Sequence, residues 1–233
     1  MIGKASLVGF MIKRVTAFFL GASTCSITLS QSINADFDFS SLGSQPASTF
    51  GAAGLVGTWS RIDIEFGGLT NAPLLNLSGA ATSATVSSSA PGANWTSLGP
   101  WTGNNALLME DWLSTTAQFP VSGIQLHGLQ AGNYSVLLYG MAFPLSSSSF
   151  TIGSTTQVLN GAWSGSQVIG TSYTRFDNVG VTSGNLAIQF SGSFNGFQLI
   201  YSPVPEPASF AALGIGVPVL LRRKRRRGGV LSR

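Results

Sequence analysis

Short runs of alternating apolar and polar residues, separated by glycine-rich turns, recur throughout residues 36–203. Residues 59–66 form the clearest run, in which Ile62, Ile64 and Phe66 share one side of an extended chain. A period of two is typical of a strand that covers a hydrophobic core with one face. Because no amphipathic helix of useful length interrupts these runs, the pattern predicts an all-β domain, a single antiparallel β-sandwich of a jelly-roll-like kind.

The remaining predicted strands are short and bounded by turn residues. They cover residues 121–129, 134–139, 150–153, 156–159, 173–179, 185–190 and 196–201, with weaker candidates at 74–77 and 82–87. The strands at 121–129 and 134–139 flank a short turn and are expected to pair as a hairpin. Residues 105–113 are the one candidate for a short helix, with Asn104 or Asn105 as its cap, although a strand and a loop fit the same residues.

The N-terminal residues have the architecture of a secretory signal peptide. Lys4, Lys13 and Arg14 form a positively charged start, residues 15–29 are apolar, and small residues follow at 33–35. The alternative is a membrane anchor that is never cut, but the apolar run is short and rich in Ser, Thr and Gly.

We expect cleavage after Ala35, so that residues 1–35 are the signal peptide and residues 36–202 form the sandwich domain. Lipidation of Cys25 is a second alternative, but the residues before it fit a lipobox poorly. Because Cys25 is the only cysteine of the chain, the mature domain would have no disulfide bond.

The C-terminal residues combine three features in a fixed order. A Pro-Glu-Pro tripeptide at 205–207 precedes an apolar run at 208–221, and a basic cluster follows at 222–227. As a short hydrophobic helix the apolar run would measure about 21 Å, against about 30 Å for the hydrocarbon core of a bilayer, so it is a marginal membrane span. Basic residues favour the cytoplasmic side of a membrane, which predicts that residues 228–233 form a cytoplasmic tail.

This order of features resembles the PEP-CTERM sorting signal of bacteria, which residues 203–227 would form. The residues that carry the resemblance are Pro205, Glu206, Pro207, Arg222, Arg223, Lys224, Arg225, Arg226 and Arg227. The resemblance implies that an exosortase-type enzyme is a partner, that it cuts near the tripeptide, and that the membrane holds the chain until then. The product would join the cell envelope or an exopolysaccharide-rich extracellular matrix. A linker followed by a plain membrane anchor is the alternative.

The charges of the chain are unevenly distributed. The whole chain carries +4, but residues 36–203 contain only two basic residues, Arg61 and Arg175, against seven acidic ones, so their net charge is −5. Because clustered cations are needed to bind a phosphate backbone, the domain is not expected to bind nucleic acid. Its polar residues are mainly Ser, Thr, Gly and Asn, which suits contact with neutral polymers.

Side chains that commonly perform catalysis are scarce. His127 is the one histidine, and no Gly-x-Ser-x-Gly nucleophile motif occurs. Asp63 with Glu65, and Glu110 with Asp111, are paired carboxylates of the kind that glycosidases use, but a solvated strand face accounts for the first pair. We therefore predict that the protein is not an enzyme and that it needs no cofactor.

Asp36 and Asp38 would lie on one side of an N-terminal strand and suggest calcium, which takes six to eight oxygen ligands. Loop carbonyls and residues 177–178 would complete such a site. The sequence favours a simpler interpretation, in which Phe37 and Phe39 anchor the strand while both aspartates are solvated and no metal is bound.

Tryptophans in glycine- and asparagine-rich segments are the best ligand-binding candidates. Trp95, Trp101 and Trp163 lie in the segments Asn-Trp-Thr, Gly-Pro-Trp-Thr-Gly and Gly-Ala-Trp-Ser-Gly. An exposed indole can stack on the apolar face of a sugar ring, whereas a buried one closes the end of a sandwich. For any single one of them the sequence favours burial, as it does for Trp59.

Two segments of the central domain resemble galactose-binding-like and other carbohydrate-binding β-sandwiches. Residues 124–140 fit a pattern of hydrophobic strand, Gly-Leu, Gly-x-Tyr and hydrophobic strand, and residues 194–200 are similar to the final strand of those domains. The resemblance implies carbohydrate binding or adhesion, with extracellular polysaccharide as a partner. Two alternatives stay open, a structural envelope protein without a specific ligand and a polysaccharide-active enzyme.

Overall fold

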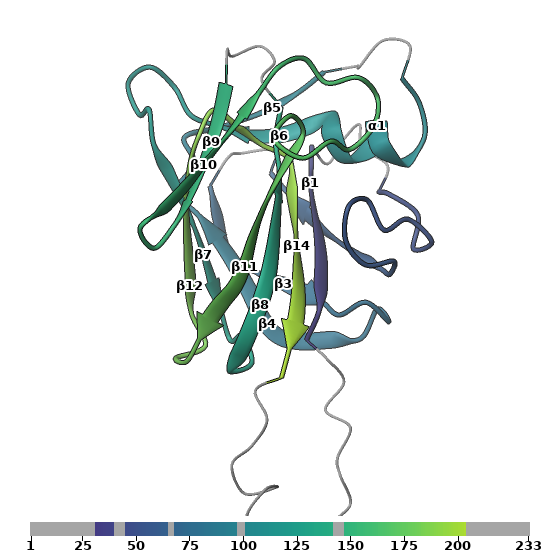
Figure 1. The fold of residues 1–233 in the computed structure, drawn as a ribbon, viewed down its shortest axis with the longest axis vertical. Helices are drawn as coiled ribbons and strands as arrows, with labels where there is room; N and C mark the ends of the chain where they lie inside the picture. Colours follow the sequence, from purple (N-terminus) through teal and green to yellow (C-terminus); the bar gives the residue numbers. More distant parts are fainter. Residues whose placement is uncertain (1–30, 40–44, 65–67, 97–100, 142–146, 204–233) are drawn as a thin grey trace, which may run out of the picture.

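The computed structural model describes residues 31–39, 45–64, 68–96, 101–141 and 147–203, which form two large β-sheets, a smaller third sheet and one short helix (Figure 1). The first sheet has the order β11 (Tyr173–Val181), β8 (Gly132–Tyr139), β14 (Gly196–Ser202), β1 (Ile33–Asp38) and β2 (Trp59–Asp63). The second has the order β10 (Thr155–Asn160), β9 (Ser147–Ile152), β12 (Leu186–Ser191), β7 (Ser122–His127), β4 (Ala81–Ser88) and β3 (Leu69–Leu75). The third contains β13 (Ser193–Phe194), β6 (Asp111–Ser114) and β5 (Gly92–Trp95), and the helix is α1 (Asn104–Met109). The predicted all-β class is confirmed.

β1 occupies an interior position in the first sheet. It runs antiparallel to β14, with Ile33 opposite Leu199, and parallel to β2, with Asn34 opposite Trp59. All other strand pairs in the described ranges are antiparallel. The start of β1 and the end of β14 therefore lie at one end of the sandwich, the terminal end, whereas α1, β5 and β6 lie at the opposite, distal end (Figure 1).

The main hydrophobic core fills the space between the two large sheets. Phe37 of β1 and Ile124 of β7 are among the side chains that the two sheets contribute to it. The predicted alternation in β2 is confirmed, because Ile62 is buried while Arg61 and Asp63 are exposed. Since two apolar sheet faces are buried against each other, the domain is a β-sandwich.

A second hydrophobic cluster covers the outer face of the first sheet. Leu137 and Tyr139 of β8 point away from the main core and belong to this cluster together with Trp59 and with Leu108 of α1. This cover explains why the second half of β8 is buried on both faces. The helix therefore adds a partial third layer at the distal end.

The predicted hairpin between residues 121–129 and 134–139 is wrong. β7 belongs to the second sheet and β8 to the first, so residues 128–131 cross from one sheet to the other. Both strands alternate apolar and polar residues as predicted, but their apolar faces meet across the core instead of lying side by side in one sheet. By contrast, β9 and β10, which contain the predicted strands 150–153 and 156–159 on either side of a short turn, do pair antiparallel.

The buried side chain of Gln31 fixes this crossing. Its Nε2 donates to the main-chain oxygen of Gly128 at 3.1 Å. Its Oε1 accepts from the N–H of Gln130 and from the hydroxyl of Tyr134. These contacts join the connection and the start of β8 to a residue about a hundred positions earlier in the sequence, and they add to the hydrogen bond that Ser83 donates to Gly128 and to the one that Tyr134 donates to Gln130.

We expect Gly128→Ala to destabilise the domain more than Gly153→Ala. Both glycines have positive φ, 65° and 60°, which costs an L-residue about 1–2 kcal/mol. At Gly153 an added Cβ would meet nothing within 4 Å, whereas at Gly128 it would lie 2.1 Å from the main-chain oxygen of Ser83. Urea denaturation of both variants measures the difference, and equal losses of unfolding free energy would contradict this close approach.

The predicted helix at 105–113 is confirmed only in its first half. α1 ends at Met109, and residues 111–114 form β6. Neither asparagine caps the helix, because it starts after Gly103 and no side-chain cap hydrogen bond is formed. Instead, Oδ1 of Asn104 accepts a hydrogen bond from the N–H of Ala47 at 2.8 Å, which ties the helix to the segment before β2.

The predicted boundary between signal peptide and domain falls inside a strand. β1 begins at Ile33, and Gln31 and Ser32 before it are already buried. The predicted signal peptide up to residue 30, the sorting motif and the predicted C-terminal helix lie outside the described residues. Within the ranges that the structure describes, no helix is both long and apolar enough to cross a membrane.

Candidate functional site

An exposed tryptophan near α1 rests on a second, buried tryptophan. The ring centroids of Trp101 and Trp163 are 5.2 Å apart, with the rings tilted by 52°. Trp101 is 40% exposed, whereas Trp163 is 7% exposed and donates from Nε1 to the oxygen of Ser166 at 3.0 Å. Trp163 thus has the buried position that the sequence favours, and it supports Trp101 at the surface.

Gly165 allows its loop to approach Trp101 closely. Its φ is 89°, and an added Cβ would lie 2.3 Å from Cδ1 of the Trp101 indole. Any other residue at this position would displace the ring or the loop. The exposed indole is therefore held by the ring of Trp163 and by the backbone of Gly165, so that its orientation is set without a ligand.

Trp95 is the third tryptophan among the ligand-binding candidates. It ends β5, opposite Asp111 of β6, and is 40% exposed. Among the described residues no ring contact joins Trp95 to either of the other two candidates. The structure thus brings together Trp101 and Trp163, which are distant in the sequence, but not Trp95.

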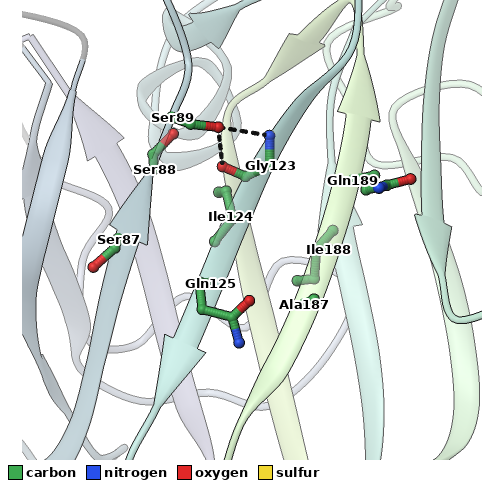
Figure 2. A pocket seen from close by; sticks show the side chains of 9 residues that line it. All are labelled: Ser87, Ser88, Ser89, Gly123, Ile124, Gln125, Ala187, Ile188 and Gln189. Atoms are coloured by element: carbon green, nitrogen blue, oxygen red, sulfur yellow. Dashed lines mark hydrogen bonds between the residues drawn. The ribbon is translucent and has the colours of Figure 1, made fainter.

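A shallow groove of about 420 Å³ crosses the outer face of the second sheet, lined by residues 87–89, 123–125 and 187–189 (Figure 2). Its lining is uncharged and mixed: serine hydroxyls and the amides of Gln125 and Gln189 lie beside apolar surface that includes Ile124 and Ile188. Sequence reasoning missed this groove. The alternation in β7 and β12 places both amides on the outer face, but only the pairing of these strands brings them to one surface, with Gln125 opposite Ala187 and Gln189 opposite Gly123.

Asp36 and Asp38 are buried, contrary to the expectation that they are solvated. They are only 2% and 1% exposed. Because Phe37 points into the main core, the two aspartates share the outer face of β1, and this face is covered. Leu108 of α1 lies over Gly196, the residue that pairs with Asp36. A Cβ added to Gly196 would be 3.1 Å from Cδ1 of Leu108.

Glu110 and Asp111 join these two aspartates in what we call the acidic cluster. Burial, and then repulsion from neighbouring carboxyl groups, raises the pKa of Asp36 well above its ordinary value and the pKa of Asp111 to about 8. Burial also raises the pKa of Asp38 and of Glu110. The basic partner is Arg61, whose Nε lies 2.5 Å from Oδ2 of Asp38. The cluster therefore holds more acidic groups than its basic partner can neutralise.

Several oxygens in and beside the acidic cluster receive no hydrogen bond from the described residues. They are the Oδ1 atoms of Asp36, Asp38, Asp111 and Asn195, all shielded from solvent. The amide of Asn195 is oriented by its Nδ2, which donates to the main-chain oxygens of Met109 at 2.9 Å and Asp111 at 2.8 Å. These oxygens lie where β1, the start of β6 and the residue preceding β14 meet.

The other residues considered for metal binding or catalysis lie elsewhere. Asp177 is on the edge strand β11, where it pairs with Arg175 at 2.8 Å and accepts a hydrogen bond from the hydroxyl of Ser135 at 2.6 Å, which lowers its pKa. It is therefore not a neighbour of the acidic cluster, and the suggested combination with residues 177–178 is wrong. His127 lies on the outer face of the second sheet, with Nδ1 3.0 Å from Oδ1 of Asn185.

Together these features define an all-β sandwich protein with a supported, exposed aromatic residue and a buried acidic cluster. No protein-family model matches the chain, and no curated protein matches it.

Two solved structures share partial similarity with the chain. One is the exo-β-1,3-galactanase from Phanerochaete chrysosporium with galactose, at 13% identity and a TM-score of 0.30, with 55% of this chain and 32% of the galactanase covered. The other is TmCBM61 in complex with β-1,4-galactotriose, at 16% identity and a TM-score of 0.26, with 51% of this chain and 88% of TmCBM61 covered. The chain thus spans about a third of the galactanase, and similarity at this level assigns it neither a ligand nor a residue role.

Proposed function

We propose that this chain is an exported protein whose sandwich binds a neutral polysaccharide through Trp101. The observation that carries the proposal is the support of this indole, which is 40% exposed yet held by Trp163 and Gly165. A flat apolar ring that is already fixed in orientation loses little conformational freedom when a sugar ring stacks on it. The proposed role is binding or adhesion, without catalysis by this chain.

The charge distribution supports a neutral ligand. Residues 36–203 contain only Arg61 and Arg175 as basic groups, and both pair with aspartates. An anionic polymer therefore has no cluster of cations to bind. The uncharged groove of the second sheet offers hydroxyl and amide groups that suit a second contact with the same kind of polymer.

The proposal of export depends on both ends of the sequence. The N-terminal segment would direct secretion, and an exosortase-type enzyme would recognise residues 205–207 and cut nearby while the apolar run and the basic cluster hold the chain at the membrane. The product would then belong to the cell envelope or the extracellular matrix. Mass spectrometry of the mature protein tests this directly: we expect a C-terminus near Pro205, and a mature protein that retains Arg233 would contradict processing.

We expect Trp101→Ala to weaken polysaccharide binding at least tenfold, equivalent to about 1.4 kcal/mol. Trp163→Ala should weaken it as well, because the exposed ring loses its support. The measurement is retention of the full chain on a panel of neutral polysaccharides, followed by titration with those that retain it. Phe119→Ala is a matched control, because it removes another exposed aromatic ring, 54% exposed, and should leave binding unchanged.

The outcome distinguishes the two surfaces. Suppose that a Gln125→Ala/Gln189→Ala double variant loses binding whereas Trp101→Ala binds like the wild type. The polysaccharide would then bind in the groove, and the proposed role of Trp101 would be refuted. Failure of every neutral polysaccharide to retain the wild-type chain would favour the structural envelope protein without a specific ligand.

A further inference from the structure

We propose that the acidic cluster, together with Asn195, binds a calcium ion. Carboxyl groups that are solvated would give no reason to propose a bound ion. Here, however, four side-chain oxygens are shielded from water and receive no hydrogen bond from the described residues, namely the Oδ1 atoms of Asp36, Asp38, Asp111 and Asn195. Buried polar atoms in proteins are almost always paired, and an unpaired buried carboxylate is especially costly. Several such oxygens on adjoining segments, β1, the start of β6 and the residue before β14, indicate a bound cation that these oxygens coordinate.

Main-chain hydrogen bonds bring these oxygens into one region. The N–H of Phe37, between the two aspartates of β1, donates to the main-chain oxygen of Asn195 at 3.0 Å. Because Nδ2 of Asn195 already donates to the oxygens of Met109 and Asp111, its Oδ1 is the amide atom left to bind a cation. The N–H of Phe39 donates to the carboxyl group of Asp111, which joins the end of β1 to the start of β6.

The balance of charge also favours a cation. Four carboxyl groups interact electrostatically in the acidic cluster, with Arg61 as their basic partner. The other arginine of residues 36–203, Arg175, pairs with Asp177 on β11, and two strands separate β11 from β1 in the sheet. In the ionised state, Arg61 neutralises one of the four negative charges and a divalent cation would compensate two of the remaining three, so cation binding would favour carboxylates that burial otherwise keeps protonated.

The donor chemistry points to calcium among the common cations. The candidate ligands are all oxygens, which suits a hard cation rather than zinc or copper. Within the described ranges, no three His, Cys, Asp or Glu side chains form a metal-binding group by themselves, so the amide of Asn195, main-chain oxygens and water would have to complete the coordination. Calcium accepts six to eight oxygens in flexible geometry, whereas magnesium demands a near-ideal octahedron.

Calcium titration of the full chain tests the proposal. After treatment with a chelator and its removal, CaCl2 should raise Tm and bind saturably in calorimetry with a Kd of about 1 mM or below, and MgCl2 should have a smaller effect. Asp36→Asn should weaken calcium binding at least tenfold. Asp177→Asn makes the same chemical change at an exposed carboxylate, 52% exposed, and should keep the wild-type response.

Terbium luminescence provides a measurement that needs no variant. Tb³⁺ bound at the acidic cluster should be sensitised by Trp112, which follows Asp111 in β6 and belongs to the second hydrophobic cluster, and calcium should displace it. Absence of both a calcium-dependent Tm shift and displaceable luminescence in the wild-type chain would overturn the proposal. A calcium response that survives in Asp36→Asn would overturn it as well, because the ion would then bind elsewhere. Neither result depends on polysaccharide binding.

Discussion

A chain that begins at Asp36 is expected not to fold, whereas one that begins at Gln31 should unfold cooperatively. The five residues that distinguish the two chains include half of β1, an interior strand. Ile33 and Ala35 are fully buried in the main core. Truncating one buried isoleucine to alanine costs about 2–5 kcal/mol, and the whole unfolding free energy of a domain is only about 5–15 kcal/mol.

Polar contacts add to this loss. The hydroxyl of Ser32 accepts from the N–H of Tyr201 at 3.0 Å, and Oδ1 of Asn34 accepts from Nε2 of Gln198 at 2.7 Å. Removing Gln31 also removes its hydrogen bonds to Gly128, in the connection between β7 and β8, and to Tyr134 of β8. Circular dichroism and thermal unfolding of fragments 31–203 and 36–203 measure the effect, and equal Tm values would contradict it.

The same contacts bear on where a signal peptidase could cut. If the chain is exported as proposed, cleavage after Ala35 would remove residues that the folded domain needs, so we expect the mature N-terminus at or before Gln31. N-terminal sequencing of the protein recovered outside the cell decides this point, and a sequence starting at Asp36 would refute it.

Phe194→Ala is expected to lower the unfolding free energy by about 3–5 kcal/mol. Phe194 is fully buried and lies at the centre of a group of phenylalanine rings. Its ring centroid is 5.2 Å from that of Phe37, 5.0 Å from that of Phe150 and 5.3 Å from that of Phe190. Such edge-to-face contacts add about 0.5–1.5 kcal/mol each to the stabilisation from burial.

Urea denaturation measures this effect, with the midpoint falling and the slope unchanged if only stability is lost. Phe119→Ala is the control, because its ring is 54% exposed and surface substitutions usually change stability by about 0.5 kcal/mol or less. Similar losses in the two variants would mean that Phe194 is not the centre of the core.

Local pattern was sufficient to predict most strands but not their partners. The alternation of residues 59–64 depends only on which face of one strand is buried, and this alternation is present in the structure. The sheet to which β7 and β8 belong depends instead on contacts such as those of Gln31, which come from another part of the chain. The period of two is the same whether two strands pair in one sheet or face each other across a core.

The candidate sites likewise depend on contacts between distant segments, which a sequence pattern does not show. The sequence shows that Asp36 and Asp38 share one side of a strand, but not that α1 covers that side. Likewise it suggests tryptophans as ligand contacts, whereas the contact of Trp101 with Trp163 and Gly165 exists only in the folded chain. Burial and proximity in this protein come from segments distant in sequence, and a single sequence contains no direct record of them.

The antiparallel pairing of β1 with β14 has a mechanical consequence. If the C-terminal end of the domain is fixed to a surface and a polymer pulls at the distal end, the force runs along β14, and its hydrogen bonds to β1 and β8 are loaded in shear and must break together. A force that pulls Ile33 and Ser202 apart would instead separate β1 from β14 one hydrogen bond at a time. The domain should therefore resist tension between its two ends far better than tension between its termini.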